Sequence, residues 1–429
     1  MDKNRFTAYK VLFRIEEHDT YSNIELNNQI RKIKPDSPAF TRELTYGVIE
    51  RKLYLDYILS QIAEGNYGGL SSKTKVLLRM GIFQLVFMDS VPEYAAVSET
   101  IEIAKTSCRK HYKLINRILR TFVRNREKIS FPENIRKRGK RLVNQYSVDK
   151  SIVELWSLQF GYDFTEELLR ASNQVPPLFI RVNTTKISKD KLAKHLISKG
   201  FEVKETGETA QMLVVSGKDI LEAEEYESGL FSVQDLASVT AVTTLAPEEN
   251  DFIIDVCAAP GGKSFCAAEM MGNKGKIISF DIFNQKVLNM SSQADRLGLH
   301  IVEARVGDAL KLRKDLTGKA DKVICDVPCS GLGVMRRKPE IKYKQIRDFA
   351  KVLADKQLRI LENSAKYLKK HGRLMYSTCT VNKVENEDVV LKFLEGHEEF
   401  ELKMQRQLFP NIDGTDGFYF AILERCGII

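Results

Sequence analysis

Apolar side chains recur every three or four positions along the first 130 residues, as at Phe6, Tyr9, Leu12 and Phe13. This spacing places apolar side chains on one face of a helix, so the pattern predicts an all-helical bundle for residues 1–130. Leu77–Met88 is apolar almost throughout, which is typical of a helix buried on every side.

Between residues 131 and 235 the pattern changes from helical to mixed. A proline and a run of charges in Phe131–Tyr146 favour a boundary, and we expect a helical linker over residues 131–170. Residues 171–235 follow the order βαββαβ, which predicts a small ferredoxin-like module, a layout also used to present RNA on a sheet. The expected strands are Leu178–Asn183, Phe201–Lys204, Gln211–Val215 and Leu230–Val233, and the expected helices are Lys189–Lys199 and Asp219–Tyr226.

Residues 236–429 contain short apolar runs, several of which end at an acidic residue or a cysteine. Strands separated by helices, such as the long helix expected at Asp348–Lys369, predict a doubly wound α/β domain. Ligands bind at the carboxyl edge of such sheets, so we expect the residues just past the strands to converge there. The expected strands are Phe252–Asp255, Lys276–Phe280, Ile301–Val306, Lys322–Cys325, Gly372–Ser377 and Gly417–Leu423.

The loop after the first of these strands consists of small residues. Ala258–Gly262 holds one proline and two glycines, so a ligand can lie against its backbone. The spacing does not fit a P-loop, because only a GGKS remnant is present. Asp281 follows the second strand and lies about 20–26 residues after the first loop. An acid at this position is well placed for ribose hydroxyls.

Charge is unevenly distributed along the chain. Residues 1–150 carry 28 Lys and Arg against 17 Asp and Glu, a net +11, so the rest carries −2 of the total +9. Such a basic segment is either a solvated surface or a contact site for a polyanion. We expect RNA contact, because one helix places Lys113, Arg117, Arg120 and Arg124 on the face opposite its apolar residues.

The seven cysteines include no CxxC pair, and the six histidines are scattered. We therefore expect free thiols in a reducing compartment, and neither a zinc site nor another metal. The first ten residues lack the apolar core of a signal peptide, and no apolar run is long enough to span a membrane. These features favour a cytoplasmic protein.

Two cysteines, Cys329 and Cys379, follow the fourth and fifth expected strands of the α/β domain. An isolated cysteine is more often a small core residue, but two cysteines at strand ends favour a catalytic role. One reaction that needs a thiolate is methylation of a pyrimidine at carbon 5. Addition of the thiolate to carbon 6 makes carbon 5 nucleophilic enough to accept a methyl group. Asp326, three residues before Cys329, could stabilise the adduct at ring N3.

Three motifs together resemble those of the NOL1/NOP2/Sun family of RNA 5-methylcytosine methyltransferases. They are DVCAAPGGK, DVPCSGLGV and YSTCT, and the segments RVNTTK and LFSVQDLAS are also similar to that family. The helical first third resembles the NusB-like RNA-binding domain of the bacterial branch that methylates 16S ribosomal RNA. The resemblance covers the whole chain and implies a Rossmann-like methyltransferase domain over residues 236–429, preceded by a ferredoxin/RRM-like module.

The resemblance also implies roles for individual residues. Cys379 matches the nucleophile and Cys329 the cysteine that assists product release, while Asp326 matches an acid near both cofactor and base. The residues implied to bind S-adenosyl-L-methionine are Cys257, Ala258, Ala259, Pro260, Gly261, Gly262, Lys263, Asp281, Asp308 and Asp326. The chain departs from the family pattern at Val327, usually alanine, and at Leu114–Arg120, where the family more often shows small residues.

The implied substrate is a cytosine of 16S ribosomal RNA, cytosine-967 by resemblance. Because the base must leave its stack to reach a thiol, we expect the RNA to be unassembled or partly assembled, and we expect the protein to be a monomer. Apart from the resemblance, the chemistry of the acids also suits S-adenosyl-L-methionine. This cofactor has no phosphate, so it needs no phosphate-binding lysine or Mg²⁺, and carboxylates can bind its ribose diol, its amine and its cation. Other interpretations are a tRNA cytosine methyltransferase, a DNA cytosine methyltransferase in which Cys329 attacks, and a non-catalytic RNA-binding or antitermination factor.

Overall fold

The computed structural model describes residues 1–429 except 19–21, 64, 66, 208–210, 218 and 428–429. The chain divides into two compact units, which are described separately below. The first comprises Met1–Asn173 and Met335–Gln345, and the second comprises Gln174–Val334 and Ile346–Ile429. Among the described residues, no helix is long and apolar enough to cross a membrane.

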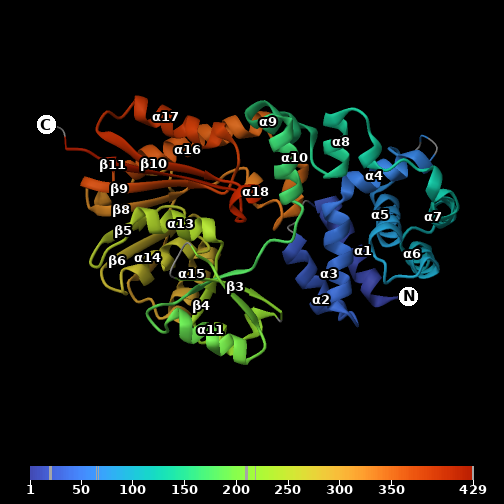
Figure 1. The fold of residues 1–429 in the computed structure, drawn as a ribbon, viewed down its shortest axis with the longest axis horizontal. Coiled ribbons are helices and arrows are strands. Elements are labelled where there is room, and N and C mark those ends of the chain that lie inside the picture. The colour runs from blue at the N-terminus through green and yellow to red at the C-terminus, as the bar shows by residue number, and fades with distance from the viewer. Residues whose placement is uncertain (19–21, 64, 66, 208–210, 218, 428–429) are drawn as a thin grey trace. The chain divides into compact units, whose positions relative to one another are not determined.

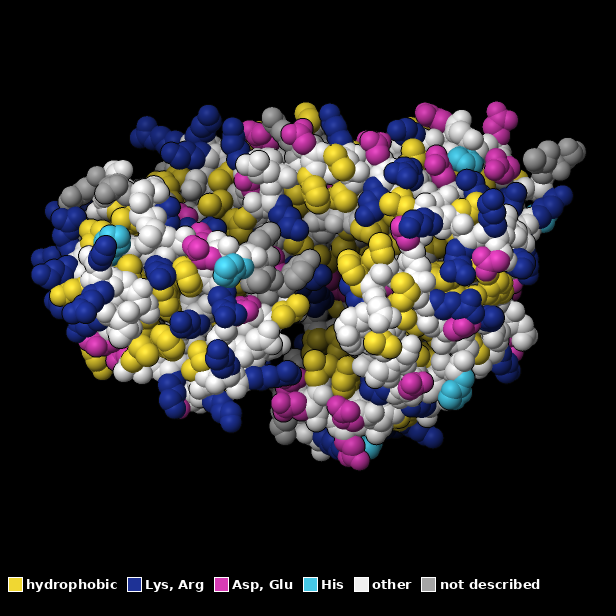
Figure 2. All heavy atoms as spheres, turned by 180° about the vertical axis from the view of Figure 1, so that it is seen from behind, with side chains coloured by type: hydrophobic (Ala, Val, Ile, Leu, Met, Phe, Trp, Pro, Cys, Tyr) yellow, Lys and Arg dark blue, Asp and Glu magenta, His cyan; other side chains and the backbone are white. Residues whose placement is uncertain are grey.

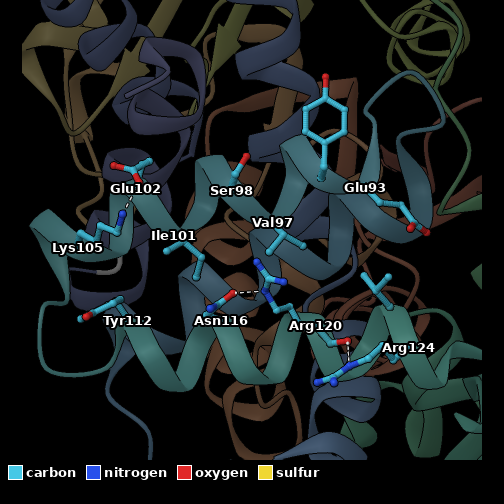
Figure 3. Close-up of a pocket in the computed structure, with 12 residues that line it drawn as sticks. Glu93, Val97, Ser98, Ile101, Glu102, Lys105, Tyr112, Asn116, Arg120 and Arg124 are labelled. Carbon is cyan, nitrogen blue, oxygen red and sulfur yellow. Dashed lines mark hydrogen bonds and ion pairs between the residues drawn. The ribbon is translucent and has the colours of Figure 1, made fainter.

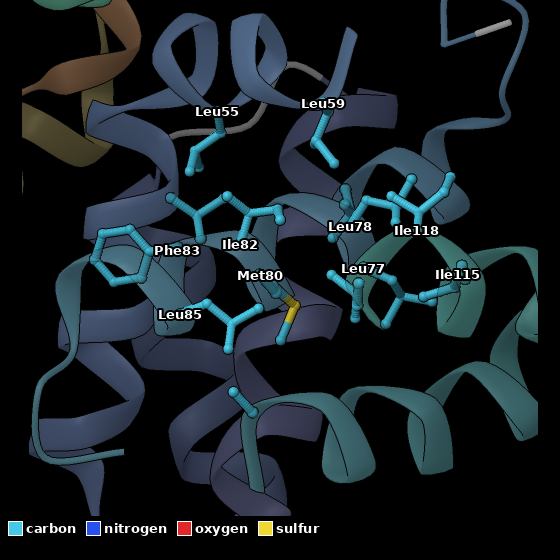
Figure 4. Close-up of a cluster of buried hydrophobic side chains, with 14 of the residues drawn as sticks. Leu55, Leu59, Leu77, Leu78, Met80, Ile82, Phe83, Leu85, Ile115 and Ile118 are labelled. Carbon is cyan, nitrogen blue, oxygen red and sulfur yellow. The ribbon is translucent and has the colours of Figure 1, made fainter. Parts of the chain in front are cut away.

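The first unit is helical, as its hydrophobic spacing predicts (Figure 1). Its central helix is α5, in which nearly every residue from Thr74 to Leu85 is buried. Leu77, Leu78, Met80 and Ile82 pack there against side chains of α4 and α7 (Figure 4). Its helices are α1 (Lys3–His18), α2 (Ser22–Ile33), α3 (Pro38–Glu50), α4 (Lys52–Ile62), α5 (Ser72–Phe87), α6 (Glu93–Ser107), α7 (Tyr112–Asn125), α8 (Arg138–Gln145), α9 (Lys150–Phe160) and α10 (Tyr162–Ala171).

The segment Met335–Gln345 belongs to this first unit although it interrupts the second in sequence. Lys342 is buried in it, and its ammonium donates to Asn173 Oδ1 at 2.5 Å and to the Glu50 carbonyl at 3.2 Å. Burial lowers the pKa of Lys342 to about 8. The Tyr343 hydroxyl lies 3.0 Å from the Ser147 hydroxyl. The sequence patterns did not predict that this segment belongs to the first unit.

The second unit begins with the expected small module. Its strands are β1 (Phe179–Val182), β2 (Glu202–Glu205), β3 (Met212–Ser216) and β4 (Phe231–Val233), with helices α11 (Lys189–Ser198) and α12 (Glu224–Glu227). The strands pair antiparallel in the order β2-β3-β1-β4, the arrangement of a ferredoxin-like sheet. Leu192 and Leu196 of α11 bury their side chains against one face of that sheet.

The rest of the second unit is an α/β domain whose described strands form a seven-stranded sheet in the order β10-β11-β9-β8-β5-β6-β7. Neighbours from β9 to β7 pair parallel, whereas β11 pairs antiparallel with β9 and with β10. The strands are β5 (Phe252–Asp255), β6 (Lys276–Asp281), β7 (Val302–Val306), β8 (Ala320–Asp326), β9 (Leu368–Thr378), β10 (Phe400–Leu408) and β11 (Phe418–Arg425).

Helices cover both faces of this sheet, because successive strand residues point to opposite sides. Ile253 packs with the helices α13 (Leu236–Leu245), α14 (Gly262–Met270) and α15 (Asn284–Leu297). Its neighbour Ile254 packs on the other face, with α16 (Arg347–Ala365) and α17 (Glu387–Glu395).

Several details differ from the sequence-based expectations. The helix expected at Asp219–Tyr226 is a 3-10 turn (Ile220–Glu222) followed by the four-residue α12. Helix α16 ends at Ala365 rather than Lys369, because β9 begins at Leu368 and pairs there with Ala320 of β8. Strand β10 was not expected: its residues are mostly polar and half-exposed, so the apolar signal of a buried strand is missing.

Candidate active site

A cavity of about 290 Å³ lies at the carboxyl ends of the parallel strands. Asp281 ends β6, Asp308 follows β7 and Asp326 ends β8, and all three line the cavity. Cys329 and Cys379 line it as well. The structure therefore brings the predicted acids and both predicted cysteines to one site, at the edge where parallel α/β sheets bind ligands.

The small-residue loop after β5 shapes one wall of this cavity. Cys257 and Ala259 line the cavity, and Ala258 is buried beside them. Gly261 has a φ of +104°, and a Cβ there would lie 2.4 Å from the ring of Phe265. Only glycine fits both restraints. Pro260, Gly261, Gly262 and Lys263 are not among the described lining residues, so they shape the loop rather than the cavity surface.

Asp255, at the end of β5, is completely buried beneath this loop. Its Oδ2 accepts a 2.7 Å hydrogen bond from the Ser264 hydroxyl, and its Oδ1 has no hydrogen-bond partner among the described residues. Burial raises the pKa of Asp255 to about 7, and the nearby Asp326 carboxyl contributes to the shift. The folded protein therefore holds a proton here that the unfolded chain releases near pH 4.

Asp255→Asn is expected to flatten the pH dependence of stability. Because folding raises the pKa of Asp255 from 3.8 to about 7, the proton stabilises the fold at low pH. That contribution declines as the pH rises through 7, and it amounts to about 3 kcal/mol between pH 5 and 8. Asparagine mimics the protonated acid and has no charge to bury.

Urea unfolding at pH 5 and pH 8 measures this effect as the change in the free energy of unfolding between the two pH values. The exposed Asp190→Asn serves as the matched control and should retain the wild-type dependence. A wild-type pH dependence in Asp255→Asn would contradict the prediction.

Lys263 pairs with Asp326, which lines the cavity together with both cysteines. Its ammonium lies 2.7 Å from Asp326 Oδ2, and the Ser377 hydroxyl donates to Asp326 Oδ1 at 2.7 Å. Burial alone lowers the pKa of Lys263, but the attraction of Asp326 outweighs it and the pKa is raised. The cation and the hydroxyl thus fix the orientation of the Asp326 carboxyl, which remains about a quarter exposed.

The two sulfurs of Cys329 and Cys379 lie 3.3 Å apart. The hydrogen bond to Cys379 and burial raise the pKa of Cys329 well above its ordinary value, so this residue remains a protonated thiol. Cys266 and Cys325, by contrast, are fully buried and behave as small core residues. Lining a cavity distinguishes the predicted pair from these two.

Sequence reasoning missed two apolar residues beside the cavity. Ile282 and Phe283, directly after Asp281, are 56% and 59% exposed and line it. Lys286 lies over the Phe283 ring at 4.8 Å. Two exposed apolar residues next to a strand-end acid suit a ligand with a flat ring and a diol. Their position after Asp281 was a signal that the sequence contained.

The predicted basic helix α7 is amphipathic as expected, with Ile115, Ile118, Leu119 and Phe122 buried. Figure 3 shows Arg120 and Arg124 beside a groove of about 740 Å³ between α6 and α7. Lys113 and Arg117 are exposed on the same helix but are not among the described residues that line the groove. On the face seen in Figure 2, Lys and Arg side chains cover much of the helical unit, at the left of the view.

Comparison with known proteins agrees with this architecture. Residues 242–424 match the family described as 16S rRNA methyltransferase RsmB/F, residues 2–124 match the NusB family, and residues 150–219 match an RsmF/B-like, ferredoxin-like domain. The chain is 32% identical to the probable ribosomal RNA small subunit methyltransferase B of Bacillus subtilis, over 99% of both chains. It belongs to this methyltransferase B family.

Solved structures are similar in fold to this member of the methyltransferase B family. The structure of PH0851 covers 99% of both chains with a TM-score of 0.83 and 25% identity. A methyltransferase homologue from Pyrococcus horikoshii covers 68% of this chain and 100% of its own, with a TM-score of 0.60 and 26% identity. The expected fold class is confirmed: a NusB-like domain, a ferredoxin-like domain and a Rossmann-like methyltransferase domain.

Membership of the family fixes the general chemistry. The protein is an rRNA methyltransferase, and its methyl donor is S-adenosyl-L-methionine. The site fits that cofactor, because acids, a small-residue loop and an exposed aromatic side chain meet in one cavity. No group of three or more His, Cys, Asp or Glu that could hold a metal occurs among the described residues.

Proposed function

We propose that the protein methylates carbon 5 of a cytosine in 16S ribosomal RNA, cytosine-967 by resemblance, through a covalent bond between Cys379 and carbon 6. The observation that carries this proposal is the contact of two thiols, 3.3 Å apart, in a cavity that also contains the oriented Asp326 carboxyl. Neither a core role nor a binding role explains two cavity-lining thiols in contact.

The chain would hold the cofactor with groups already at the cavity. Asp281 suits the ribose hydroxyls, Asp308 suits the adenine amine, and the loop Cys257–Lys263 would lie along the methionine portion. Phe283 offers its ring to the adenine face. S-adenosyl-L-methionine, when bound, supplies an electrophilic methyl group.

The thiols divide the remaining chemistry between them. The Cys379 thiolate adds to carbon 6 of the cytosine while ring N3 takes up a proton from solvent, and the new N3–H donates a hydrogen bond to the Asp326 carboxyl. N3 returns this proton when the ring is restored. After carbon 5 has gained its methyl group, a base removes the carbon-5 proton and the electron pair expels the Cys379 thiolate. Cys329, a thiol beside that sulfur, is placed to hydrogen-bond to the departing thiolate and so to assist release.

The RNA must present its target base outside a stack, because a thiol cannot reach carbon 6 within a helix. We therefore infer that the substrate is 16S ribosomal RNA before or during its assembly. The decisive experiment maps 5-methylcytosine in 16S ribosomal RNA from cells with and without the protein. The mark should be lost from one cytosine, and purified protein should restore it on protein-free RNA.

The alternative activities give different results in the same assay. Methyl transfer to tRNA or DNA instead of 16S ribosomal RNA would support another cytosine methyltransferase. RNA binding without any methyl transfer would support a non-catalytic binding factor, and either result would overturn the proposal.

The basic helix should supply salt-sensitive affinity for this RNA. Replacing both Arg120 and Arg124 with alanine is expected to reduce the slope of log affinity against log salt by about 1 to 2, because each phosphate contact releases counterions. Filter binding between 50 and 200 mM salt measures the slope. A control variant lacking Arg373 and Arg406, which are paired with Glu424 and Asp413, should keep the wild-type slope. Equal slopes in all three proteins would exclude Arg120 and Arg124 as RNA contacts.

A further inference from the structure

Two adjacent side chains behind the cavity reach the loops of both cysteines. Glu385 ends a short 3-10 turn (Lys383–Glu385) and Asn386 precedes α17. Both are fully buried, and neither is among the described residues that line the cavity. They are therefore placed to act on the cysteines through neighbouring residues rather than by contact with a substrate.

Glu385 holds the residues on either side of Cys329. Its two carboxyl oxygens accept hydrogen bonds from the Ser330 amide at 2.8 Å and the Ser330 hydroxyl at 2.5 Å. They also accept from the Gln357 side-chain amide at 3.1 Å, and the same amide donates to the Pro328 carbonyl at 2.9 Å. A fourth bond comes from Asn382 at 2.9 Å. The carboxyl group thus restrains both neighbours of Cys329.

Asn386 restrains the residues on either side of Cys379. The Thr378 hydroxyl donates to Asn386 Oδ1 at 2.6 Å, and Asn386 Nδ2 donates to the Thr380 carbonyl at 3.1 Å. The amide also donates to Gln407 Oε1 at 2.7 Å. Every polar atom of this buried side chain therefore has a partner, which makes its orientation unique.

The hydrogen bonds around Cys329 and those around Cys379 are joined directly. The Leu332 amide donates to the Thr380 hydroxyl at 3.3 Å, and that hydroxyl lies 2.7 Å from the Ser330 hydroxyl. Ser330 in turn donates to Glu385, so hydroxyl groups link the loop of Cys379 to the carboxyl that restrains Cys329. Such buried chains are rigid when every member is satisfied.

We propose that Glu385 and Asn386 are positioning residues that set the distance between the two sulfurs, Glu385 through the Cys329 loop and Asn386 through the Cys379 loop. The role in catalysis rests on the function proposed above, whereas the role in geometry does not. Because misplacement of a reacting group by about 1 Å costs about 100-fold in rate, such restraints matter to turnover.

The two residues are distinguished by the step that each controls. Glu385→Gln turns an amide NH₂ toward a donor of the Ser330 loop, so release should slow and the covalent protein–RNA adduct should accumulate. Asn386→Asp turns an oxygen toward the Thr380 carbonyl, so adduct formation should slow and no adduct should accumulate. Each is expected to lower turnover about 10- to 100-fold with S-adenosyl-L-methionine affinity unchanged within about twofold.

A second readout tests the geometry without any methyl transfer. Diamide accepts two electrons and two protons from the two thiols and joins Cys329 to Cys379 as a disulfide, whose peptide is measured by mass spectrometry. Both variants should form this disulfide about tenfold more slowly than the wild type, because close and fixed sulfurs react fastest. Wild-type rates in both variants would overturn the positioning proposal.

The matched control is Glu225→Gln, a buried glutamate of the ferredoxin-like module, which should leave adduct level and disulfide rate unchanged. If Glu385→Gln fails to fold, Ser330→Ala replaces it, since it removes the hydroxyl link and keeps the backbone bond. Slow disulfide formation in both variants, with no adduct in Glu385→Gln or in Cys329→Ala, would refute the proposed function and leave the positioning role standing. Equal loss of adduct in both variants would refute the division of steps.

Discussion

Cys379→Ala is expected to abolish methyl transfer, lowering the rate by more than about 1000-fold, because the variant has no nucleophile to activate carbon 5. Affinity for S-adenosyl-L-methionine should stay within about twofold, since the acids that line the cavity remain in place. The measurement is transfer of a labelled methyl group to protein-free 16S ribosomal RNA under single-turnover conditions. Binding of the cofactor is followed separately by calorimetry.

The matched control is Cys426→Ala, which removes a partly exposed thiol of the last strand region and should retain wild-type activity. Retained activity in Cys379→Ala together with its loss in Cys329→Ala would assign the nucleophile to Cys329. That outcome would favour the mechanism of the DNA cytosine methyltransferases and refute the division of roles proposed here.

Cys329→Ala is expected to trap the protein on its RNA. Without the thiol that lies 3.3 Å from Cys379, the departing thiolate loses its hydrogen-bond donor and release slows. Addition and methyl transfer should proceed, so turnover should stop after about one cycle. The adduct is measured as a slowly migrating band in a denaturing gel that disappears after treatment with ribonuclease.

A double variant, Cys329→Ala with Cys379→Ala, provides the control, because it should form no such band. If Cys329→Ala turns over at the wild-type rate, the second thiol takes no part in release. If neither single variant nor the wild type ever forms an adduct, the covalent mechanism is wrong while the family assignment stands.

The residues at the strand ends could be predicted from the sequence because local patterns carry the needed information. Asp281 and Asp326 each follow a short apolar run, and Asp308 comes two residues after the strand expected at Ile301–Val306. Parallel strands with helical crossovers bring their carboxyl ends to one edge. The amphipathic spacing of α7 fixed which of its residues would be buried and left Arg120 and Arg124 exposed. These features depend on residues close together in the chain.

The structure alone decided which distant residues meet. Cys329 and Cys379 are 50 positions apart, and their contact follows from the register of β8 and β9, in which Asp326 lies opposite Ser377. Nothing in the pattern near Glu385 and Asn386 indicates that they restrain both cysteine loops, since buried hydrogen bonds leave no periodic signal. The burial of Lys342 within the helical unit is of the same kind.

The difference between what the sequence predicts and what only the structure decides has a physical reason. Hydrophobic periodicity and strand-end chemistry are properties of a few neighbouring residues, so the sequence by itself determined the classes of fold, the acids and the thiols of this protein. Distances between loops depend instead on strand register and on polar side chains packed between elements, where a shift of one residue changes every partner. Only the tertiary structure therefore decided that the two sulfurs touch and that Glu385 and Asn386 lie behind them.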